Sequence, residues 1–247
     1  MENKLKEQNR DVIYQVSLLQ SLAYGDYCGS VTVKELKQHG DVGIGTFNKL
    51  NGELIMLDGA VYRAAGDGSV ELVSDDETSP FSVVTYMDAD ETRIFKDIPD
   101  FDALCSILDQ IAKERGINRF YMIRVDGMFR EVNVRSVYAQ EKPYKRLAEV
   151  MEHDQTFYNY ENIEGTLVGL YCPPYMSSLN AVGWHLHFIS KDKTKGGHVL
   201  GLHIADAVLL WDDTDGFQMR LPPNADFNRF DLTVDQSEDI KKVETNQ

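Results

Sequence analysis

Four of the six histidines in this chain lie within one segment, AVGWHLHFISKDKTKGGHVLGLHIAD, residues 181–206. In an extended strand, side chains two residues apart point to the same face, so His185 and His187 would lie side by side. His198 follows a charged turn that contains two glycines, and an antiparallel return strand would bring it close to that pair. Three imidazoles can occupy three corners of a tetrahedron around a metal ion, which leaves the fourth for water or substrate, as in catalytic sites. His203 would face the other way in a regular strand.

This pattern predicts a metal centre with an open coordination position. Zinc is the default ion for imidazole ligands, although iron, manganese, cobalt and nickel accept them as well. A histidine pair on an exposed strand face, without metal, would also produce the HLH motif. The third histidine favours the metal because all three side chains can then point to one place.

Glu53 and Arg135 are the candidate partners of such a metal. A metal that polarises a carbonyl usually needs a proton donor or acceptor beside it. Glu53 follows Asn51-Gly52, a pair typical of a type I′ hairpin turn, and could project from a strand end into a cleft. Arg135 lies near valines at strand spacing, and a half-buried guanidinium needs a carboxylate, either from the protein or from a substrate. An exposed glutamate and a structural salt bridge remain alternative explanations.

The elements that would position these groups divide the chain in two. Up to residue 155 the pattern alternates strands with helices, and the clearest helix runs from about residue 101 to 114, between an Asp100 cap and Gly116. A capping box at Thr32 predicts a second, short helix, and Asp126-Gly127 predicts a hairpin turn. After residue 156 we expect strands up to a polar tail. The expected fold is therefore α/β (α+β): residues 1–155 form a mixed sheet with helices, and residues 156–247 form an antiparallel β-barrel-like domain.

Composition limits the classes of partner. A formal net charge of −15 repels phosphate backbones and anionic membrane surfaces, so we expect neither nucleic acid nor membrane as a partner. No apolar run approaches the roughly 20 residues that span a bilayer. The three cysteines lie far apart and are expected to be reduced thiols, and the N-terminus lacks the apolar core of a signal peptide. These features predict a cytoplasmic protein, and exposed hairpins make a homodimer plausible.

Three motifs, GTFNKLNGELIMLDGAVY, VRSVYAQEKPY and GWHLHFISKDKTKGGHVL, occur in this order. Together they resemble the α-acetolactate decarboxylase family, over roughly residues 17–244. The resemblance implies a metal-dependent enzyme, usually with zinc, that converts 2-acetolactate to acetoin and carbon dioxide. It also implies two domains with the metal between them and a C-terminal tail ordered over the active site. By their positions in the motifs, the implied site residues are the metal ligands His185, His187 and His198, the active-site residues Glu53 and Arg135, a second glutamate, Glu244, and a pocket residue, Thr46.

In the mechanism that this resemblance suggests, the metal stabilises the enediolate that remains after carbon dioxide leaves. Arg135 would orient the carboxylate or stabilise the departing group, a bidentate role that also makes it a substrate-binding residue. Glu53 or Glu244 would deliver a proton to one face of the enediolate and so set the chirality of acetoin.

Two other functions fit part of the pattern. A cupin-like metalloenzyme also carries HxH on a barrel strand, but the cupin motif has a glutamate a few residues later, and here no acidic residue follows His187 before Asp192. A non-catalytic module that binds a metal or ligand would need neither an arginine nor a glutamate beside the metal.

Overall fold

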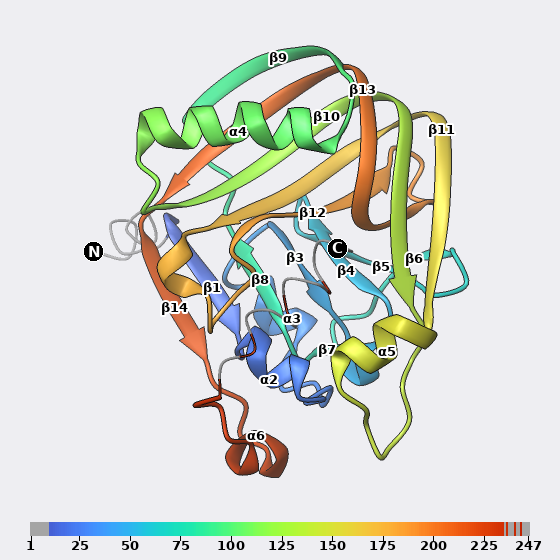
Figure 1. Ribbon diagram of the computed structural model, residues 1–247, viewed down its shortest axis with the longest axis vertical. Coiled ribbons are helices and arrows are strands. Elements are labelled where there is room, and N and C mark those ends of the chain that lie inside the picture. The colour runs from blue at the N-terminus through green and yellow to red at the C-terminus, as the bar shows by residue number, and fades with distance from the viewer. Residues whose placement is uncertain (1–9, 235, 237–239, 241–242, 244–247) are drawn as a thin grey trace.

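The computed structural model of the chain describes residues 10–234, 236, 240 and 243. Its strands form two large sheets that pack face to face, and a pair of short strands lies beside them (Figure 1). The first sheet has the strand order β14 (Gly216–Arg220), β1 (Val12–Val16), β8 (Ser82–Thr85), β3 (Val42–Thr46), β4 (Glu53–Leu57), β5 (Ala60–Ala64) and β6 (Val70–Leu72). The second has the order β10 (Phe120–Val137), β11 (Gln155–Cys172), β12 (Gly183–Ser190), β13 (Gly196–Thr214) and β9 (Glu91–Ile98). The short pair is β2 (Val31–Thr32) and β7 (Thr78–Ser79).

The helices are few and short, apart from the one that the sequence predicts most clearly. They are α2 (Leu19–Ala23), α3 (Val33–Leu36), α4 (Phe101–Arg115), α5 (Leu147–His153) and α6 (Ala225–Arg229), with 3-10 turns at η1 (Asn48–Leu50) and η2 (Pro174–Met176). The mixed α+β fold is thus confirmed, with strands dominating. None of the helices in the described part of the chain is long and apolar enough to cross a membrane.

Four strands of the second sheet form a closed circuit of pairings. β10 pairs with β11 on one edge and with β13 on the other, while β12 pairs with both β11 and β13. The last of these ladders is short, with three residue pairs between β12 and β13. The circuit is barrel-like, and β9 extends the sheet beyond it along β13.

The ladder between β10 and β13 contains bulges. Between Asn133, which pairs with Gly201, and Val134, which pairs with Val199, the register shifts by one residue, so Leu200 has no partner in the ladder. A bulge of this kind changes which face the following side chains occupy. Beyond it, Arg135 pairs with His198.

Three apolar clusters fill the layers. The largest lies between the two sheets and includes Ile44 and Ile55 of the first sheet with Val168 and Ile189 of the second. Another packs the outer face of the second sheet against α4, which runs across that face in Figure 1. A third covers the remaining face of the first sheet, together with α3. The face of the second sheet that carries the even-numbered residues of β12, Leu186 and Phe188, is therefore part of the core.

Both predicted helices are confirmed together with their caps. Asp100 accepts a hydrogen bond from the Ala103 N–H at the start of α4. Thr32 likewise accepts one from Glu35 at the start of α3.

Of the two predicted hairpin turns, one is wrong and the other differs in type. Asp126 and Gly127 lie inside the continuous strand β10 and pair with both neighbouring strands. Asn51-Gly52 does lie in the connection of an antiparallel hairpin, between β3 and β4. The connection is not a two-residue type I′ turn, because Asn51 has φ −83° and the paired strands end at Thr46 and begin again at Glu53. The expected domain boundary at residue 155 stays a prediction about folding units; each large sheet combines strands from both sides of it.

Candidate metal centre

Three buried histidines meet at one point between the sheets. The Nε2 atom of His185 lies 3.1 Å from Nε2 of His187 and 3.0 Å from Nδ1 of His198. Nitrogen ligands at the usual zinc distance in a tetrahedral site would be about 3.3 Å apart. Among the described residues, these three form the single group of histidine, cysteine or acidic side chains whose ligand atoms all lie within 4.8 Å of one another. The donor set and its spacing fit a divalent metal ion.

The strands explain this convergence. His185 and His187 are two residues apart on β12, and His187 pairs directly with His198 across the short ladder to β13. His198 pairs in turn with Arg135 on β10, so His187, His198 and Arg135 lie in one row across three adjacent strands. Paired residues share a face of the sheet, and this face looks toward the first sheet.

The protonation states suit metal binding. The Nδ1–H of His187 donates to the Leu54 carbonyl at 2.9 Å, which leaves Nε2 as the unprotonated nitrogen that faces the other two rings. Burial, together with the positive charge of Arg135, lowers the pKa of His185 to about 3. Burial and the neighbouring His185 lower the pKa of His187 well below its usual value. Neutral imidazoles need not lose a proton before they bind a metal.

Glu53 lies beside the three histidines. It begins β4, is 8% exposed, and its Oε2 lies 3.5 Å from Nε2 of His187. The loop before it is held by Thr46, whose hydroxyl donates to the Gly52 carbonyl at 2.7 Å. The carboxylate is thus close enough to contact an ion held by the histidines, or a small molecule bound to that ion.

Arg135 is buried in the same place, with 2% of its surface exposed. Its Nε and Nη1 atoms have no hydrogen-bond partner in the described part of the chain. A buried guanidinium with unsatisfied donors is energetically unfavourable, and a carboxylate ligand would satisfy it through charge-assisted hydrogen bonds. Among the described residues, Arg135 forms no structural salt bridge of the kind considered from the sequence.

A small cavity of about 40 Å³ joins these groups. Thr46, Glu53, Arg135, His185 and His198 all line it. The rest of its wall is apolar, apart from Gly45, and consists of Leu19, Leu22, Leu50, Phe81, Leu147, Met151 and Val243. We call it the inner cavity. It brings together every described residue that the sequence motifs singled out, apart from His187, which contacts the cavity residues His185 and Glu53.

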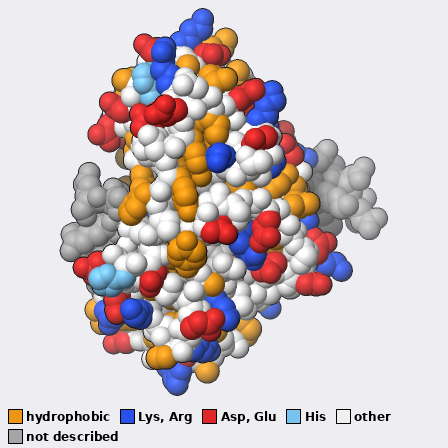
Figure 2. Space-filling view, turned by 90° about the vertical axis from the view of Figure 1, so that its right-hand side faces the viewer, with side chains coloured by type: hydrophobic (Ala, Val, Ile, Leu, Met, Phe, Trp, Pro, Cys, Tyr) orange, Lys and Arg blue, Asp and Glu red, His pale blue; other side chains and the backbone are white. Residues whose placement is uncertain are grey.

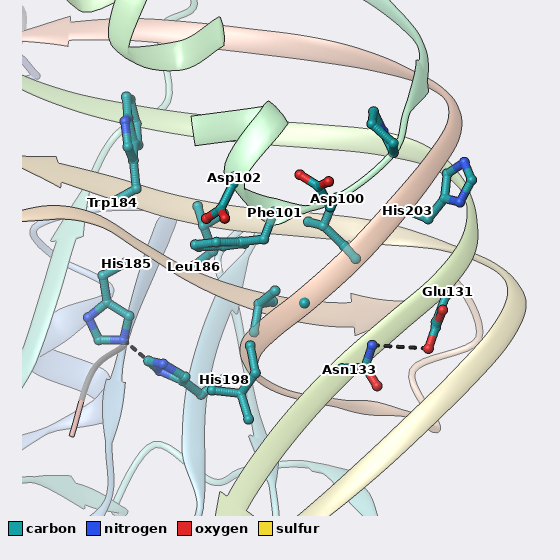
Figure 3. Close-up of a pocket in the computed structure, with 15 residues that line it drawn as sticks. Asp100, Phe101, Asp102, Glu131, Asn133, Trp184, His185, Leu186, His198 and His203 are labelled. Carbon is teal, nitrogen blue, oxygen red and sulfur yellow. Dashed lines mark hydrogen bonds between the residues drawn. The ribbon is translucent and has the colours of Figure 1, made fainter. Parts of the chain in front are cut away.

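A larger opening of about 510 Å³, the outer cleft, reaches His185 and His198 from another side (Figure 3). Three carboxylates line it, from Asp100, Asp102 and Glu131. In Figure 3 these groups lie at a distance from the two histidine rings, which meet at the lower end of the view. His203 lines the cleft as well, and its Nε2 lies 3.3 Å from the Asp97 carboxylate rather than with the other histidines.

Two contributors to the site could not be found from the sequence. The Leu54 carbonyl orients His187, but a backbone acceptor has no signature in residue types. Val243 lines the inner cavity although it lies in a polar tail, and its apolar neighbour at helical spacing, Ile240, is the only other signal there. Glu244, the next residue, is outside the described part of the chain.

Comparison with known proteins places these features in a family. Residues 13–234 match the family model described as alpha-acetolactate decarboxylase. The curated alpha-acetolactate decarboxylase of Methanosarcina mazei is 43% identical over 234 residues, which cover 95% of this chain and 80% of the relative. That of Bacillus subtilis strain 168 is 37% identical over 242 residues, covering 98% and 93%.

Solved structures agree. The crystal structure of the Bacillus subtilis strain 168 alpha-acetolactate decarboxylase has a TM-score of 0.91 at 36% identity and covers 95% of this chain and 99% of the other. A Staphylococcus aureus protein, described as of unknown function and similar to alpha-acetolactate decarboxylase, has a TM-score of 0.88 at 30% identity, with coverage of 94% and 100%. The chain belongs to the alpha-acetolactate decarboxylase family.

Proposed function

We propose that the protein is a carboxy-lyase that converts 2-acetolactate to acetoin and carbon dioxide. The observation that carries this proposal is the buried guanidinium of Arg135, with donors unsatisfied among the described residues, beside three buried histidines and a glutamate. An anionic substrate with adjacent ketone and hydroxyl oxygens would satisfy both the guanidinium and a metal ion. The size of the inner cavity favours a small substrate.

In this proposal His185, His187 and His198 hold the metal ion. The positive charge of the ion would stabilise the negative charge that develops on the ketone oxygen as carbon dioxide leaves. Arg135 binds the substrate carboxylate and so fixes the bond that breaks. The apolar wall of the cavity excludes water, which strengthens these charge interactions. Thr46 holds the loop before Glu53 and lines the substrate position.

Glu53 is our first candidate for the proton donor to the enediolate, because its carboxylate lies within 3.5 Å of His187. Glu244 is the second candidate, since it follows Val243, which lines the inner cavity. Delivery from one fixed side would set the chirality of the acetoin formed. We further propose zinc as the native ion, in accord with three imidazole ligands. Metal analysis of the protein as purified would identify it.

The test is to supply the purified, metal-loaded protein with 2-acetolactate and to follow carbon dioxide release and acetoin formation. We expect turnover in the wild type and a loss of at least about 100-fold in Arg135→Lys, with metal content unchanged, because lysine cannot form the bidentate contact. Arg130→Lys is the matched control, since Arg130 is on the same strand but exposed. An unchanged rate in Arg135→Lys would remove this residue from the mechanism. Metal binding without any carbon dioxide release would indicate a non-catalytic module instead.

Two further properties are part of the proposal. Ile94, on edge strand β9, is 73% exposed, and its cross-strand neighbour Val208 is 40% exposed, so this edge offers an apolar surface for a second copy of the chain. Light scattering would measure the expected homodimer.

The three cysteines form no disulfide, as is typical of a reducing compartment such as the cytoplasm; they are Cys28, Cys105 and Cys172. Cell fractionation would test that location.

A further inference from the structure

A second concentration of charge lies away from the three histidines, where three segments of the chain meet. It contains five aspartates: Asp11, Asp88, Asp90, Asp212 and Asp215. Asp11 precedes β1, Asp88 and Asp90 lie between β8 and β9, and the other two lie at the end of β13. We call these five residues the aspartate cluster.

Backbone hydrogen bonds hold the three segments together. The Gly216 N–H donates to the Asp11 carbonyl and the Asp90 N–H donates to the Trp211 carbonyl, both at 2.9 Å. The Asp213 N–H donates to the Asp90 carboxylate, also at 2.9 Å. The segments belong to different sheets, because β1 and β8 are in the first and β9 and β13 in the second. The cluster is therefore part of the junction between the sheets.

Asp212 is the unusual member of this cluster. Its side chain is 1% exposed, yet neither carboxylate oxygen accepts a hydrogen bond from any described residue with good geometry. Thr214 lies two residues along the same strand, is fully buried, and its hydroxyl also has no hydrogen-bond partner in the described part of the chain. Side chains two residues apart in a strand share a face, so three unsatisfied oxygens are buried together. Such groups need a partner, and an ion is one that this chemistry allows.

The negative charges around Asp212 also favour a bound cation. Burial and, after it, the negative charges of Asp90, Asp11 and Asp88 together raise the pKa of Asp212 to about 7, although the nearby Asp88 backbone lowers it in part. Burial and the neighbouring aspartates also raise the pKa of Asp11. Arg10 offsets part of this charge, since its Nε lies 3.5 Å from an oxygen of Asp88. A divalent cation would relieve the remaining repulsion.

We propose that the aspartate cluster, with Asp212 and the Thr214 hydroxyl at its buried end, binds one Ca²⁺ ion. All the donors there are oxygens, which Ca²⁺ prefers, with six to eight ligands and a tolerant geometry. No three of these carboxylates, all of which the structure describes, have ligand oxygens that all lie within 4.8 Å of one another, so the ion binds some of them through water. In this position it links the first sheet to the second. This inference does not rest on the proposed function, because it concerns other residues and another class of metal.

The experiment uses the full-length protein with its transition metal in place. Calcium is removed from the buffer, Ca²⁺ is titrated back, and binding is followed by calorimetry and by Tm. We expect one saturable site per chain and a Tm that rises with Ca²⁺. A rise of the same size with Mg²⁺ at equal ionic strength would indicate charge screening alone and overturn the proposal, as would the absence of any response.

Two variants locate the site. Asp212→Asn should abolish the Ca²⁺-dependent rise in Tm, while Asp206→Asn, an exposed aspartate on the same strand, should retain it. If Asp212→Asn does not fold, Asp90→Asn takes its place. Its amide oxygen can still accept the hydrogen bond from the Asp213 N–H, so the fold is preserved. We expect this variant to lose at least tenfold in Ca²⁺ affinity. Transition-metal content should be the same in all variants. Undiminished Ca²⁺ binding in Asp212→Asn or in Asp90→Asn would refute the assignment.

Discussion

At the scale of single residues, the site depends on one row of side chains. His187, His198 and Arg135 are direct cross-strand neighbours, so the groups proposed to hold the metal and the substrate carboxylate are fixed by backbone pairing. His187 is also anchored to the first sheet through the Leu54 carbonyl. The geometry of the site is therefore set by strands and requires little from flexible loops.

Replacing His187 with alanine should remove the metal and the activity together. Two imidazoles bind a divalent ion far more weakly than three, and the contact with Leu54 is lost as well. Metal content per chain, measured after gel filtration, should fall close to zero. His203→Ala is the control, since this histidine lies in the same segment but pairs with Asp97, and it should keep its metal. A His187→Ala protein with full metal content would contradict the ligand assignment.

Replacing Glu53 with glutamine should lower acetoin formation by about 100-fold or more while the metal stays bound, because the amide cannot transfer the proton. The measurement is turnover together with the enantiomeric composition of the acetoin. Glu141→Gln, at an exposed position, should have no effect. Normal turnover in Glu53→Gln would rule out Glu53 as the proton donor and make Glu244 the remaining candidate.

The sequence predicts much of this site, for physical reasons. Histidines two residues apart on a strand, with a third after a tight turn, have few alternative arrangements, and the structure confirms their convergence. The position of Arg135 beside them depends on β10 running on to Val137 and on the bulge at Leu200, and neither has a local signature. The orphaned donors of Arg135 likewise emerge only once its neighbours are known.

At the scale of elements, α4 is attached to the second sheet by a charged contact at its C-terminal end. Arg115 donates to both oxygens of Asp213 on β13, at 2.7 and 2.6 Å, and to Glu91 on β9 at 3.0 Å. Burial alone would raise the pKa of Asp213, but the hydrogen bonds from Arg115 and Trp211 keep it below its usual value. This contact therefore stabilises the folded state while Asp213 is charged.

Replacing Arg115 with alanine should reduce the free energy of unfolding by about 1–3 kcal/mol at pH 7, the range for hydrogen bonds to charged groups. Because the folded-state pKa of Asp213 is depressed, its contribution is complete above the unfolded pKa and is lost as the pH falls through the folded value. Denaturant unfolding should thus show a difference in the free energy of unfolding between the wild type and Arg115→Ala at pH 7. This difference should become smaller below about pH 4. Lys113→Ala, an exposed change on the same helix, should have the same free energy of unfolding as the wild type. If the difference between the wild type and Arg115→Ala does not depend on pH, the ion pair is contradicted.

The elements also show where sequence patterns mislead. The apolar period of α4 and its two caps predict it nearly to the residue, because these signals are local. Asp126-Gly127 has the composition of a turn, yet a Cβ at Gly127 would lie 2.3 Å from the Asp206 carbonyl. Glycine is needed there for the close approach of β13, and that approach depends on residues some 80 positions away in the chain.

At the scale of the whole molecule, the site lies between two sheets, and a described residue of the tail, Val243, lines its inner cavity. Val243 and Ile240 are 6% and 5% exposed and belong to the apolar cluster between the sheets. On the face shown in Figure 2, acidic, basic and apolar side chains of the described residues are interspersed, in keeping with a net charge of −15 that has no single focus on that face. Specificity for an anion must then come from Arg135 inside the protein, because the surface as a whole repels one.

Ending the chain at residue 235 should lower turnover by at least about tenfold and leave the metal in place. The truncation removes Val243 from the wall of the inner cavity, which admits water, and it removes Glu244. The kinetics should be compared with full-length Val243→Ser and Glu244→Gln, which separate loss of closure from loss of a proton donor. Wild-type turnover in the truncated chain would mean that the tail has no part in catalysis.

The unpaired Leu200 shows how one strand supplies two different environments. In a regular strand His198 and Leu202, four residues apart, would project to the same side. The extra residue reverses the alternation between them. Leu202 therefore packs in the apolar cluster under α4, while His198 lies on the opposite face with the other histidines. Removing Leu200 would restore the regular alternation of side chains along β13. Either the apolar Leu202 would then lie in the polar pocket, or the imidazole of His198 would lie in the apolar core. The metal centre would then be lost by a deletion that touches none of its ligands.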